Sequence, residues 1–286
     1  MLLHGVALTF GTPAIVELLG DDRLGPALLV VAGVYLALAG TVFRDERQRD
    51  HATLLWSVAL AFAAVAAPQL LDGTLLVAAW AAPAAALAVL TRLLREPRFL
   101  VASVAFTLLV LAEAVVRLAP PADLISANAH PGDGVPALLL ALAAALTLLR
   151  VAPSRPPLAS AYWATGLVGL YTISLTLLEL FERTPGGGVD DRFQRGHTAV
   201  SACWALVALG LLYAGLSRRM RALRLGGFAL FGAALAKIFL YDLASLSSVA
   251  RALSFLAVGA LLLVGGFFYQ RLSQQLLADR DPIAEA

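Results

Sequence analysis

Long apolar runs, repeated along nearly the whole chain, limit what this sequence can fold into. A helix needs about 20 mostly apolar residues to span a bilayer, and the runs here approach that length one after another. Only helices and closed barrels satisfy every backbone polar group inside lipid. Barrel strands alternate apolar and polar residues, whereas these runs are continuously apolar and rich in Leu and Ala. The sequence therefore predicts an all-α, polytopic transmembrane helical bundle.

Composition agrees with this class and excludes several others. Hydrophobic residues make up 60% of the 286 residues and charged residues only 14%, against about a quarter in soluble domains. The net charge of +2 gives no basis for a nucleic-acid partner. The single cysteine, Cys203, excludes an internal disulfide and a Cys-based metal cluster. We expect no metal and no cofactor.

The apolar runs and the breakers between them predict about ten spans. Residues 1–19 form a weak first span, because His4, Pro13 and Glu17 dilute it, and they lack the features of a signal peptide. The other spans are predicted at 26–43, 52–67, 74–94, 99–118, 136–149, 158–181, 198–216, 225–243 and 249–272. No connection is long enough to separate two domains, so residues 1–286 are expected to form a single transmembrane domain.

Arginines predict the orientation of the bundle. They gather in every second connection, and few lie in the others except for a cluster in the loop after residue 181. By the positive-inside rule the arginine-rich connections and both termini face the cytoplasm. The expected localisation is a bacterial inner membrane, crossed many times. The arginine-rich connections carry Arg44, Arg47, Arg49, Arg92, Arg95, Arg98, Arg150, Arg155, Arg218, Arg219, Arg221, Arg224, Arg271 and Arg280.

A weak internal repeat is also visible. Trp80 opens one hairpin that turns through an arginine-rich connection, and Trp204 opens a second hairpin of the same kind four helices later. Two hairpins offset by four helices share one orientation, as a parallel repeat requires. The small residues Ala229, Gly232 and Ala233, and also Gly166 and Gly169, are expected to permit close helix packing.

Ionisable side chains within the spans are the candidates for function. Each costs about 2.5–3.5 kcal/mol near a helix centre on insertion scales, so it usually faces a partner or a wet cavity. Lys237 lies about 18 Å along its helix from Leu225, just beyond the membrane centre toward the outer face. The other candidates also fall in the outer half. The candidate ligand-binding residues are Glu113, Arg117, Glu179, Lys237, Asp242 and Arg251.

Two interpretations of these charges stay open. In the structural one, Glu113 and Arg117 pair four residues apart on one helix face, and Asp242 and Arg251 clamp the turn between the last two helices. In the functional one, Lys237 is the deepest charge of an outward-facing polar cavity, opposite Glu113 or Glu179. That cavity would bind an anionic headgroup or relay protons.

No catalytic motif is present, so no catalytic residue is assigned and an enzyme is not the expected class. There is no H-E-x-x-H and no Ser-His-Asp spacing. An enzyme acting in the outer half would have to use His130, His197, Asp190 or Asp191. His130 and His197 share the outer side, but the four histidines are spread over different segments, which argues against a metal site.

The C-terminal residues resemble a bacterial family of "predicted membrane proteins" of unknown function. The positions that carry the resemblance are Ser201, Trp204, Arg224, Gly226, Lys237, Asp242, Arg251, Ser254, Phe255, Tyr269, Gln270 and Arg271. Residues 66–80 and Glu179 are similar to further family segments. Members of this family are commonly longer, so the chain resembles their C-terminal part. The resemblance implies a polytopic membrane protein and supplies no mechanism.

The leading hypothesis is a non-enzymatic protein that binds or transports a lipid-linked or anionic envelope component. Lys237 would contact the anion, and Lys237→Ala is expected to abolish function while Arg251→Ala mainly lowers stability. The alternatives are a structural or assembly module of a membrane complex and a membrane-embedded transferase. The expected partners are membrane lipids, with a membrane-protein partner or a second copy of the chain as further candidates.

Overall fold

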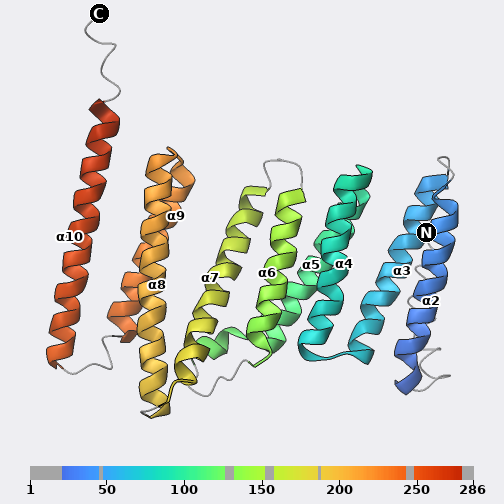
Figure 1. The fold of residues 1–286 in the computed structure, drawn as a ribbon, viewed down its shortest axis with the longest axis horizontal. Helices are drawn as coiled ribbons and strands as arrows, with labels where there is room; N and C mark the ends of the chain where they lie inside the picture. The colour runs from blue at the N-terminus through green and yellow to red at the C-terminus, as the bar shows by residue number, and fades with distance from the viewer. Residues whose placement is uncertain are drawn as a thin grey trace, which may run out of the picture. The chain divides into compact units, whose positions relative to one another are not determined.

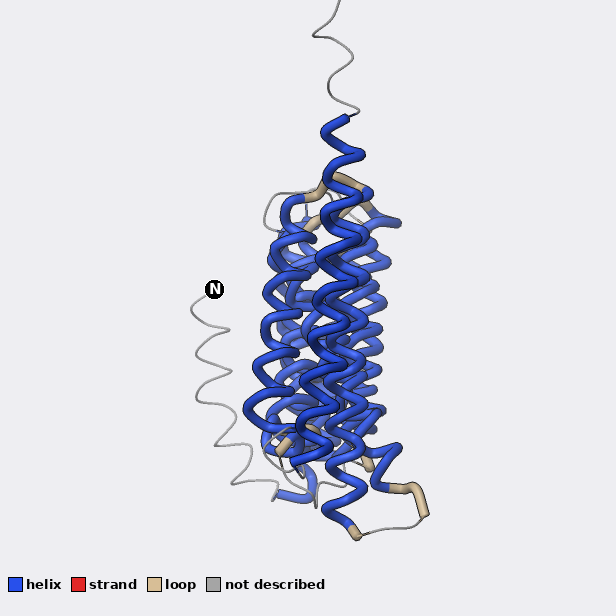
Figure 2. The backbone as a smooth tube through the Cα atoms, turned by 90° about the vertical axis from the view of Figure 1, so that its left-hand side faces the viewer, coloured by secondary structure: helices blue, strands red, loops and turns tan. Residues whose placement is uncertain are grey.

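The computed structural model describes residues 21–44, 48–125, 132–151, 158–185, 188–242 and 248–278, and every regular element within these ranges is helical (Figure 2). The elements are α2 (Asp21–Val42), α3 (Arg49–Leu70), α4 (Gly73–Leu94), α5 (Arg98–Glu113), η2 (Ala114–Leu118), η3 (Pro121–Leu124), α6 (Gly134–Val151), α7 (Leu158–Glu182), α8 (Val189–Ser217), α9 (Arg221–Lys237), η4 (Ile238–Asp242) and α10 (Ser248–Ala278) (Figure 1). The all-α prediction is confirmed.

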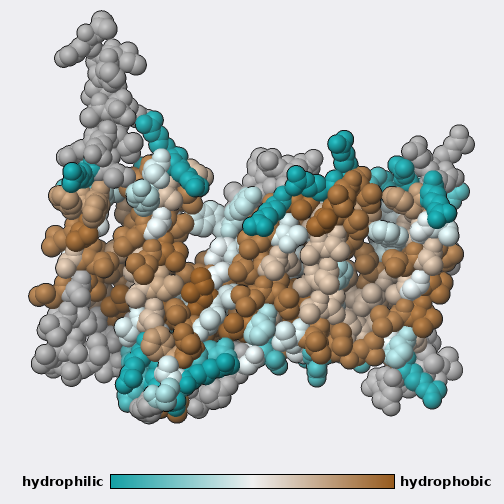
Figure 3. Space-filling model, viewed as in Figure 1, coloured by the Kyte–Doolittle hydropathy of each residue, from teal (hydrophilic) through white to brown (hydrophobic). Residues whose placement is uncertain are grey.

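Eight of the described segments, which correspond to α2 through α9, are long and apolar enough to cross a membrane. They coincide with the second to ninth predicted spans, and α10 lies where the tenth was predicted. The predicted first span, residues 1–19, lies outside the described residues. On the face drawn in Figure 3, hydrophobic side chains cover the middle of the helices and hydrophilic ones gather at their ends. This is the distribution that lipid requires of a surface.

The chain groups into two compact units, which meet within α7 at Thr172 and Ile173. Unit 1 contains α2 to α6 and the first part of α7, and unit 2 contains the rest of α7 with α8, α9 and α10. We describe each unit by itself. A single transmembrane domain over residues 1–286 stays a prediction.

In unit 1, α2 packs on α3 and α4 packs on α5 and α6. Leu24 and Leu28 of α2 are buried against Ala66 of α3. Polar side chains tie neighbouring helices at their backbones. Trp80 Nε1 donates to the Ala64 carbonyl at 3.2 Å, which joins α4 to α3. Ser103 Oγ donates to the Ala84 carbonyl at 2.7 Å and joins α5 to α4. Such bonds suit a membrane interior, where apolar packing alone gives helices little preference for each other over lipid.

In unit 2, α8 packs on α9, and glycines set how closely the helices approach. A Cβ on Gly227 of α9 would lie 2.9 Å from the Leu212 nitrogen of α8, and one on Gly196 of α8 would lie 3.0 Å from Leu178 of α7. The prediction of close packing is wrong for Gly166 and Gly232, because no described atom of a neighbouring helix lies within 4 Å of the Cβ that each would carry. A Cβ on Gly169 of α7 would lie 3.8 Å from Leu142 of α6, in ordinary contact. Residue size alone does not reveal which face of a helix meets a neighbour.

The hairpins α4–α5 and α8–α9 share one backbone plan, in a register offset by 124 residues. Trp80 corresponds to Trp204, and each indole donates to the preceding helix. Arg95 corresponds to Arg219, and both adopt a left-handed φ of 55° in the turn of their hairpin. Among the described residues these are the only two positive φ values outside glycine.

The same offset holds to the end of each hairpin. Ser103 corresponds to Gly227, and Ala84 corresponds to Ala208. Ser103 donates to the Ala84 carbonyl, and a Cβ built on Gly227 would lie 3.0 Å from the Ala208 oxygen. The π-helical η2 and η4 follow α5 and α9 at equivalent positions. The predicted repeat is therefore present as a shared geometry of two hairpins, and it makes Glu113 and Lys237 equivalent positions.

Candidate functional site

Lys237 lies at the point where α9 changes from α-helix to the π-helical η4. A π-helical turn widens the helix by one residue per hydrogen-bonded ring, and such turns occur frequently at functional sites. The hydrophobic segment continues beyond it to Tyr241. The local fold therefore places a lysine within a membrane-spanning segment and alters the backbone directly after it.

The Lys237 ammonium is fixed to α8 by two hydrogen bonds. Nζ donates to the His197 carbonyl at 3.0 Å and to Ser201 Oγ at 2.7 Å. Ser201 Oγ in turn donates to the same His197 carbonyl at 3.1 Å. His197 and Ser201 are 4% and 2% exposed, whereas Lys237 is half-buried. These two acceptors orient the ammonium between α9 and α8.

A cluster of aromatic rings lies beside this ammonium. The His197 ring packs edge-on against Phe193 at 4.5 Å between centroids and tilts against Tyr241 at 4.7 Å. Lys237 Nζ lies 5.6 Å from the centroid of the Tyr241 ring, within the range of a cation–π interaction. Because Tyr241 belongs to η4, the π-helical turn brings its ring to the lysine that precedes it.

Two further contacts hold α7 beside this site. Trp204 Nε1 of α8 donates to Ser174 Oγ of α7 at 2.9 Å. Arg192 near the start of α8 donates to the Glu182 carbonyl at 3.0 Å and to the Thr184 carbonyl at 3.2 Å. Arg192 thereby satisfies carbonyls at the C-terminus of α7, where a cation is also favoured by the helix dipole. These bonds tie α8 to α7 at two levels, one within the helices and one next to their connection.

The predicted acidic residues find arginine partners on or next to their own helices. Glu113 pairs with Arg117 at 3.4 Å, as the structural interpretation predicted. Glu179 pairs with Arg183. In each pair the acid is largely buried, with side-chain exposures of 12% and 14%, while the arginine extends outward at about 70%. The arginine stem crosses apolar surface and its head reaches water.

The structure divides the six predicted residues between the two units. Glu113 and Arg117 belong to unit 1, and Glu179, Lys237, Asp242 and Arg251 belong to unit 2. Asp242 ends η4 and Arg251 lies in the first turn of α10, but their side chains lie outside the described residues, and so does the predicted clamp between them. Lys237 is the member whose contacts the structure describes most fully.

The residues that an enzyme would have to use are not gathered into one site within the described part of the chain. His197 is buried between Phe193 and Tyr241, and Asp190 and Asp191 are exposed in the first turn of α8. His130 lies outside the described residues. Within the described ranges, no three His, Cys, Asp or Glu side chains gather closely enough to hold a metal ion.

Sequence reasoning singled out Lys237 but missed what surrounds it. Ser201 was noted only for the family resemblance, and the His197 carbonyl and the Tyr241 ring were not considered. A signal for Ser201 exists in the hairpin itself. Arg219 in the turn lies 18 residues from both Ser201 and Lys237, so an antiparallel hairpin brings these two to the same depth.

The fold and the Lys237 site define the class of this protein: a polytopic, all-helical membrane protein with a fixed ammonium inside one of its spans. Residues 134–272 match the family described as "Predicted membrane protein (DUF2339)". The predicted resemblance to the C-terminal part of a family of unknown function is therefore confirmed. Glu179, Lys237, Asp242 and Arg251 lie inside the matched segment, whereas Glu113, Arg117 and residues 66–80 lie outside it.

The comparisons with curated proteins and with solved structures give no match.

Proposed function

We propose that this protein binds an anionic group of a lipid or lipid-linked envelope component at Lys237, in the outer half of the membrane. The observation that carries the proposal is the position of the Lys237 ammonium, held at 3.0 and 2.7 Å by the His197 carbonyl and Ser201 Oγ while the side chain keeps part of its surface exposed. An ammonium in this position can donate to a phosphate or carboxylate oxygen.

Magnitudes favour a role for the charge itself. A lysine at a helix centre costs about 2.5–3.5 kcal/mol on insertion scales, and less toward the end of a span, where the side chain can reach the interface. Lys237 lies four residues before Tyr241, at which its span ends. An interhelical hydrogen bond inside a membrane returns on average about 0.6 kcal/mol. A neutral glutamine or serine could tie α9 to α8 at a lower cost than an ammonium. The positive charge at Lys237 is thus more than the tie between α9 and α8 requires, and this supports a role for the charge in binding.

The rigid surroundings support binding of a defined group. His197, Phe193 and Tyr241 pack ring against ring, and the Tyr241 ring lies beside the ammonium. A cation that is already oriented loses little conformational freedom when an anion arrives, and this loss is a main cost of binding.

A second candidate function is a structural module, and one observation favours it: both hydrogen bonds of Lys237 cross from α9 to α8. In that case Lys237 is an interhelical clamp. Its effect would then appear in the free energy of unfolding and not in ligand binding.

The experiment compares Lys237→Gln with Glu113→Gln in lipid nanodiscs that contain an anionic phospholipid. Glu113→Gln alters the equivalent position of the other hairpin and leaves Lys237 untouched. Native mass spectrometry counts the anionic lipid retained by each protein. We expect Lys237→Gln to retain about tenfold less than wild type, since an ionic hydrogen bond of about 1.5–3 kcal/mol is lost. We expect Glu113→Gln to match wild type.

Thermal unfolding separates the two candidates. A double-mutant cycle of Lys237→Gln and Ser201→Ala should give a coupling energy of about 0.6 kcal/mol in either case, because the two side chains are bonded. Equal lipid retention in wild type and Lys237→Gln, together with a lowered midpoint, would reject anion binding and leave the clamp.

A further inference from the structure

A groove lies between α6 and α7 in unit 1, toward the connection that joins these two helices. Its empty space, including the open mouth, is about 770 Å³, within the about 300–1,000 Å³ that is usual for pockets that bind small molecules. We name it the α6–α7 groove. Its lining includes Leu142, Leu146 and Arg150 of α6 and Tyr162, Gly166 and Gly169 of α7.

The α6–α7 groove is closed at its deep end and widens toward the connection. At the deep end a Cβ on Gly169 would lie 3.8 Å from Leu142. Close by, the Tyr171 hydroxyl donates to the Ala119 carbonyl at 2.6 Å and ties α7 to the end of η2. Three residues nearer the connection, a Cβ on Gly166 would meet no described atom within 4 Å. The missing glycine side chains therefore leave room between the helices.

The depth of the groove matches one leaflet of a bilayer. From Leu142 to Arg150 it extends about 12 Å along α6, at about 1.5 Å per residue. One leaflet supplies about half of a hydrocarbon core of about 30 Å. The positive-inside rule assigns the connection after Arg150 to the cytoplasmic face. The groove thus covers the depth at which an acyl chain of an inner-leaflet lipid lies.

The chemistry of the deep part favours an acyl chain over water. Leucines and glycines line it, and the Thr165 hydroxyl already donates to the Ala161 carbonyl at 2.8 Å. A bound water needs about two to four polar partners, and this lining offers few. At the edge of the groove Leu146 is 41% exposed and Tyr162 is 58% exposed, so a chain can enter from the side.

The charge at the mouth favours an anionic headgroup. Arg150 lies in the last turn of α6, is exposed, and pairs with no acid among the described residues. From residue 134 to residue 178 the sequence contains no Asp or Glu, so the connection between α6 and α7 adds only the positive charge of Arg155. Guanidinium groups match phosphate oxygens in geometry and charge, and basic pockets between helices at the cytoplasmic face bind phospholipid headgroups.

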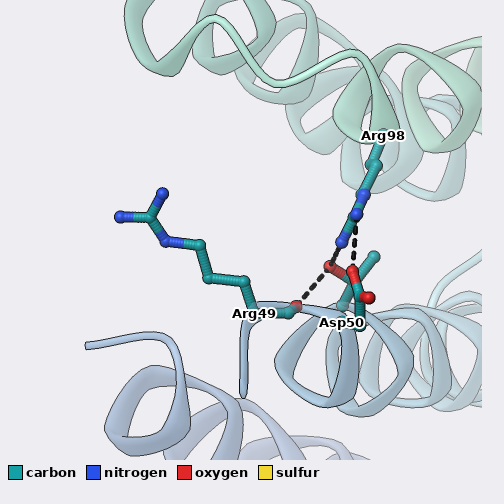
Figure 4. A network of polar contacts seen from close by, with 4 residues as sticks. Arg49, Asp50 and Arg98 are labelled. Atoms are coloured by element: carbon teal, nitrogen blue, oxygen red, sulfur yellow. Dashed lines mark hydrogen bonds and ion pairs between the residues drawn. The ribbon is translucent and has the colours of Figure 1, made fainter. Parts of the chain in front are cut away.

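The neighbouring α4–α5 connection differs, because its charges are balanced locally. Arg98 at the start of α5 pairs with Asp50 at 2.6 Å and donates to Thr53 Oγ1 at 3.0 Å (Figure 4). Glu96 of the same connection lines a separate hollow beside Arg98. Neither Asp50 nor Glu96 lines the α6–α7 groove.

We propose that the α6–α7 groove holds one anionic phospholipid of the inner leaflet, with an acyl chain against Leu146 and Gly166 and the phosphate at Arg150. Tyr162 adds a hydroxyl near the same rim, and tyrosine favours the membrane interface. The groove lies in unit 1, whereas Lys237 lies in unit 2. This site is therefore separate from the proposed function.

The test uses the full chain in nanodiscs of phosphatidylcholine and phosphatidylglycerol. One of the two lipids at a time carries a photoactivatable diazirine in its acyl chain, and mass spectrometry locates the cross-linked residues. Arg150→Gln removes the charge at the mouth. Gly166→Leu fills the groove without a clash, because no described atom lies within 4 Å of the added Cβ.

Each variant has a matched control outside the groove. Arg92→Gln removes an arginine from the last turn of α4, as Arg150→Gln does from the last turn of α6. Gly33→Leu places the same side chain on α2, again with no described atom within 4 Å of its Cβ. Neither Arg92 nor Gly33 lines the α6–α7 groove. The unfolding midpoint shows that each variant is folded.

In wild type we expect phosphatidylglycerol to cross-link to residues 142–169 about tenfold more than phosphatidylcholine does, since an ionic hydrogen bond favours it. Arg150→Gln should remove most of this preference and keep cross-links from both lipids. Gly166→Leu should remove the cross-links of both. Both controls should match wild type. Lys237→Gln should also match it, so a failure of the proposed function leaves this result unaffected.

Three outcomes would overturn the proposal. The first is equal labelling of residues 142–169 by the two lipids in wild type. The second is an equal effect of Arg150→Gln and Arg92→Gln, or of Gly166→Leu and Gly33→Leu. The third is no lipid cross-link in this range together with a dimer mass that Gly166→Leu abolishes, which would show that a second copy of the chain fills the groove.

Discussion

Single charged residues inside the spans are held in two different ways, and the chemistry of each side chain decides which. Glu113 and Lys237 occupy equivalent positions of the two hairpins. A carboxylate only accepts hydrogen bonds, and helix backbone donors inside a span are already used, so Glu113 takes Arg117 one turn away. An ammonium donates, and a carbonyl has a second lone pair to offer, so Lys237 reaches the His197 carbonyl of the neighbouring helix.

At the same scale, Asp123 gives a prediction about pH. It lies in η3, between spans, and burial raises its pKa above the ordinary 3.8. The folded state therefore holds this proton more tightly than the unfolded state. Its contribution to stability is complete below 3.8 and is lost as pH rises through the raised pKa. The Asn side chain of Asp123→Asn cannot ionise. The unfolding midpoint of this variant should therefore not fall as pH rises above 3.8, whereas the wild-type midpoint should.

The measurement is thermal unfolding in nanodiscs across the acid range, with Asp72→Asn as the control. Asp72 is an exposed acid at the start of α4, so its replacement should leave the wild-type slope intact. If the unfolding midpoints of Asp123→Asn and wild type fell equally with rising pH, a group other than Asp123 would be responsible for the pH dependence.

At the scale of elements, the helices could be predicted closely and their ends less so. The fifth span was predicted at 99–118 and is found over Arg98–Leu118. The eighth was predicted from 198, but α8 begins at Val189. The nine extra residues include Asp190, Asp191 and Arg195, which are polar yet helical. Hydropathy detects where lipid begins, and α8 starts before that point.

Packing within the hairpins could not be predicted from the same patterns. Gly227 and Gly232 are both small residues of α9 in a run of Ala, Leu and Phe. Only Gly227 faces the α8 backbone. The apolar pattern of a membrane helix lacks the contrast between inside and outside that marks the buried face of a soluble helix. The left-handed φ of 55° at Arg219 likewise could not be predicted, because arginine has no preference for that conformation.

These two glycines provide the prediction for the α8–α9 hairpin. A Cβ at Gly227 would lie 2.9 Å from the Leu212 nitrogen and 3.0 Å from the Ala208 oxygen, and both are backbone atoms that cannot turn aside. Gly227→Ala should lower the free energy of unfolding by about 1–3 kcal/mol, the usual cost of overpacking. Gly232→Ala meets no atom within 4 Å and should stabilise α9 by up to about 1 kcal/mol through helix propensity. Thermal unfolding of the two variants checks both signs, and a loss at Gly232 would refute this assignment of faces.

At the scale of the whole molecule, the two hairpins constrain the topology. Because successive spans alternate in direction, helices four spans apart are predicted to run the same way through the membrane, as a parallel repeat requires. The turns at Arg95 and Arg219 are then predicted to face one side, and the starts of α4 and α8 the other. The arginine pattern independently assigns the turns to the cytoplasm. The repeat thus predicts that the two turns share a side, and the arginine pattern predicts that this side is cytoplasmic.

Cysteine labelling in intact bacterial cells tests that orientation. Because Cys203 is the only cysteine, Cys203→Ser gives a cysteine-free background. Asp72→Cys and Thr184→Cys should react with a membrane-impermeant maleimide from outside, since these exposed positions lie before α4 and before α8. Arg95→Cys and Arg219→Cys should react only after the inner membrane is permeabilised. If Asp72→Cys and Thr184→Cys reacted from opposite sides, α4 and α8 would run in opposite directions, and the equivalence of Glu113 with Lys237 would be lost with the parallel repeat.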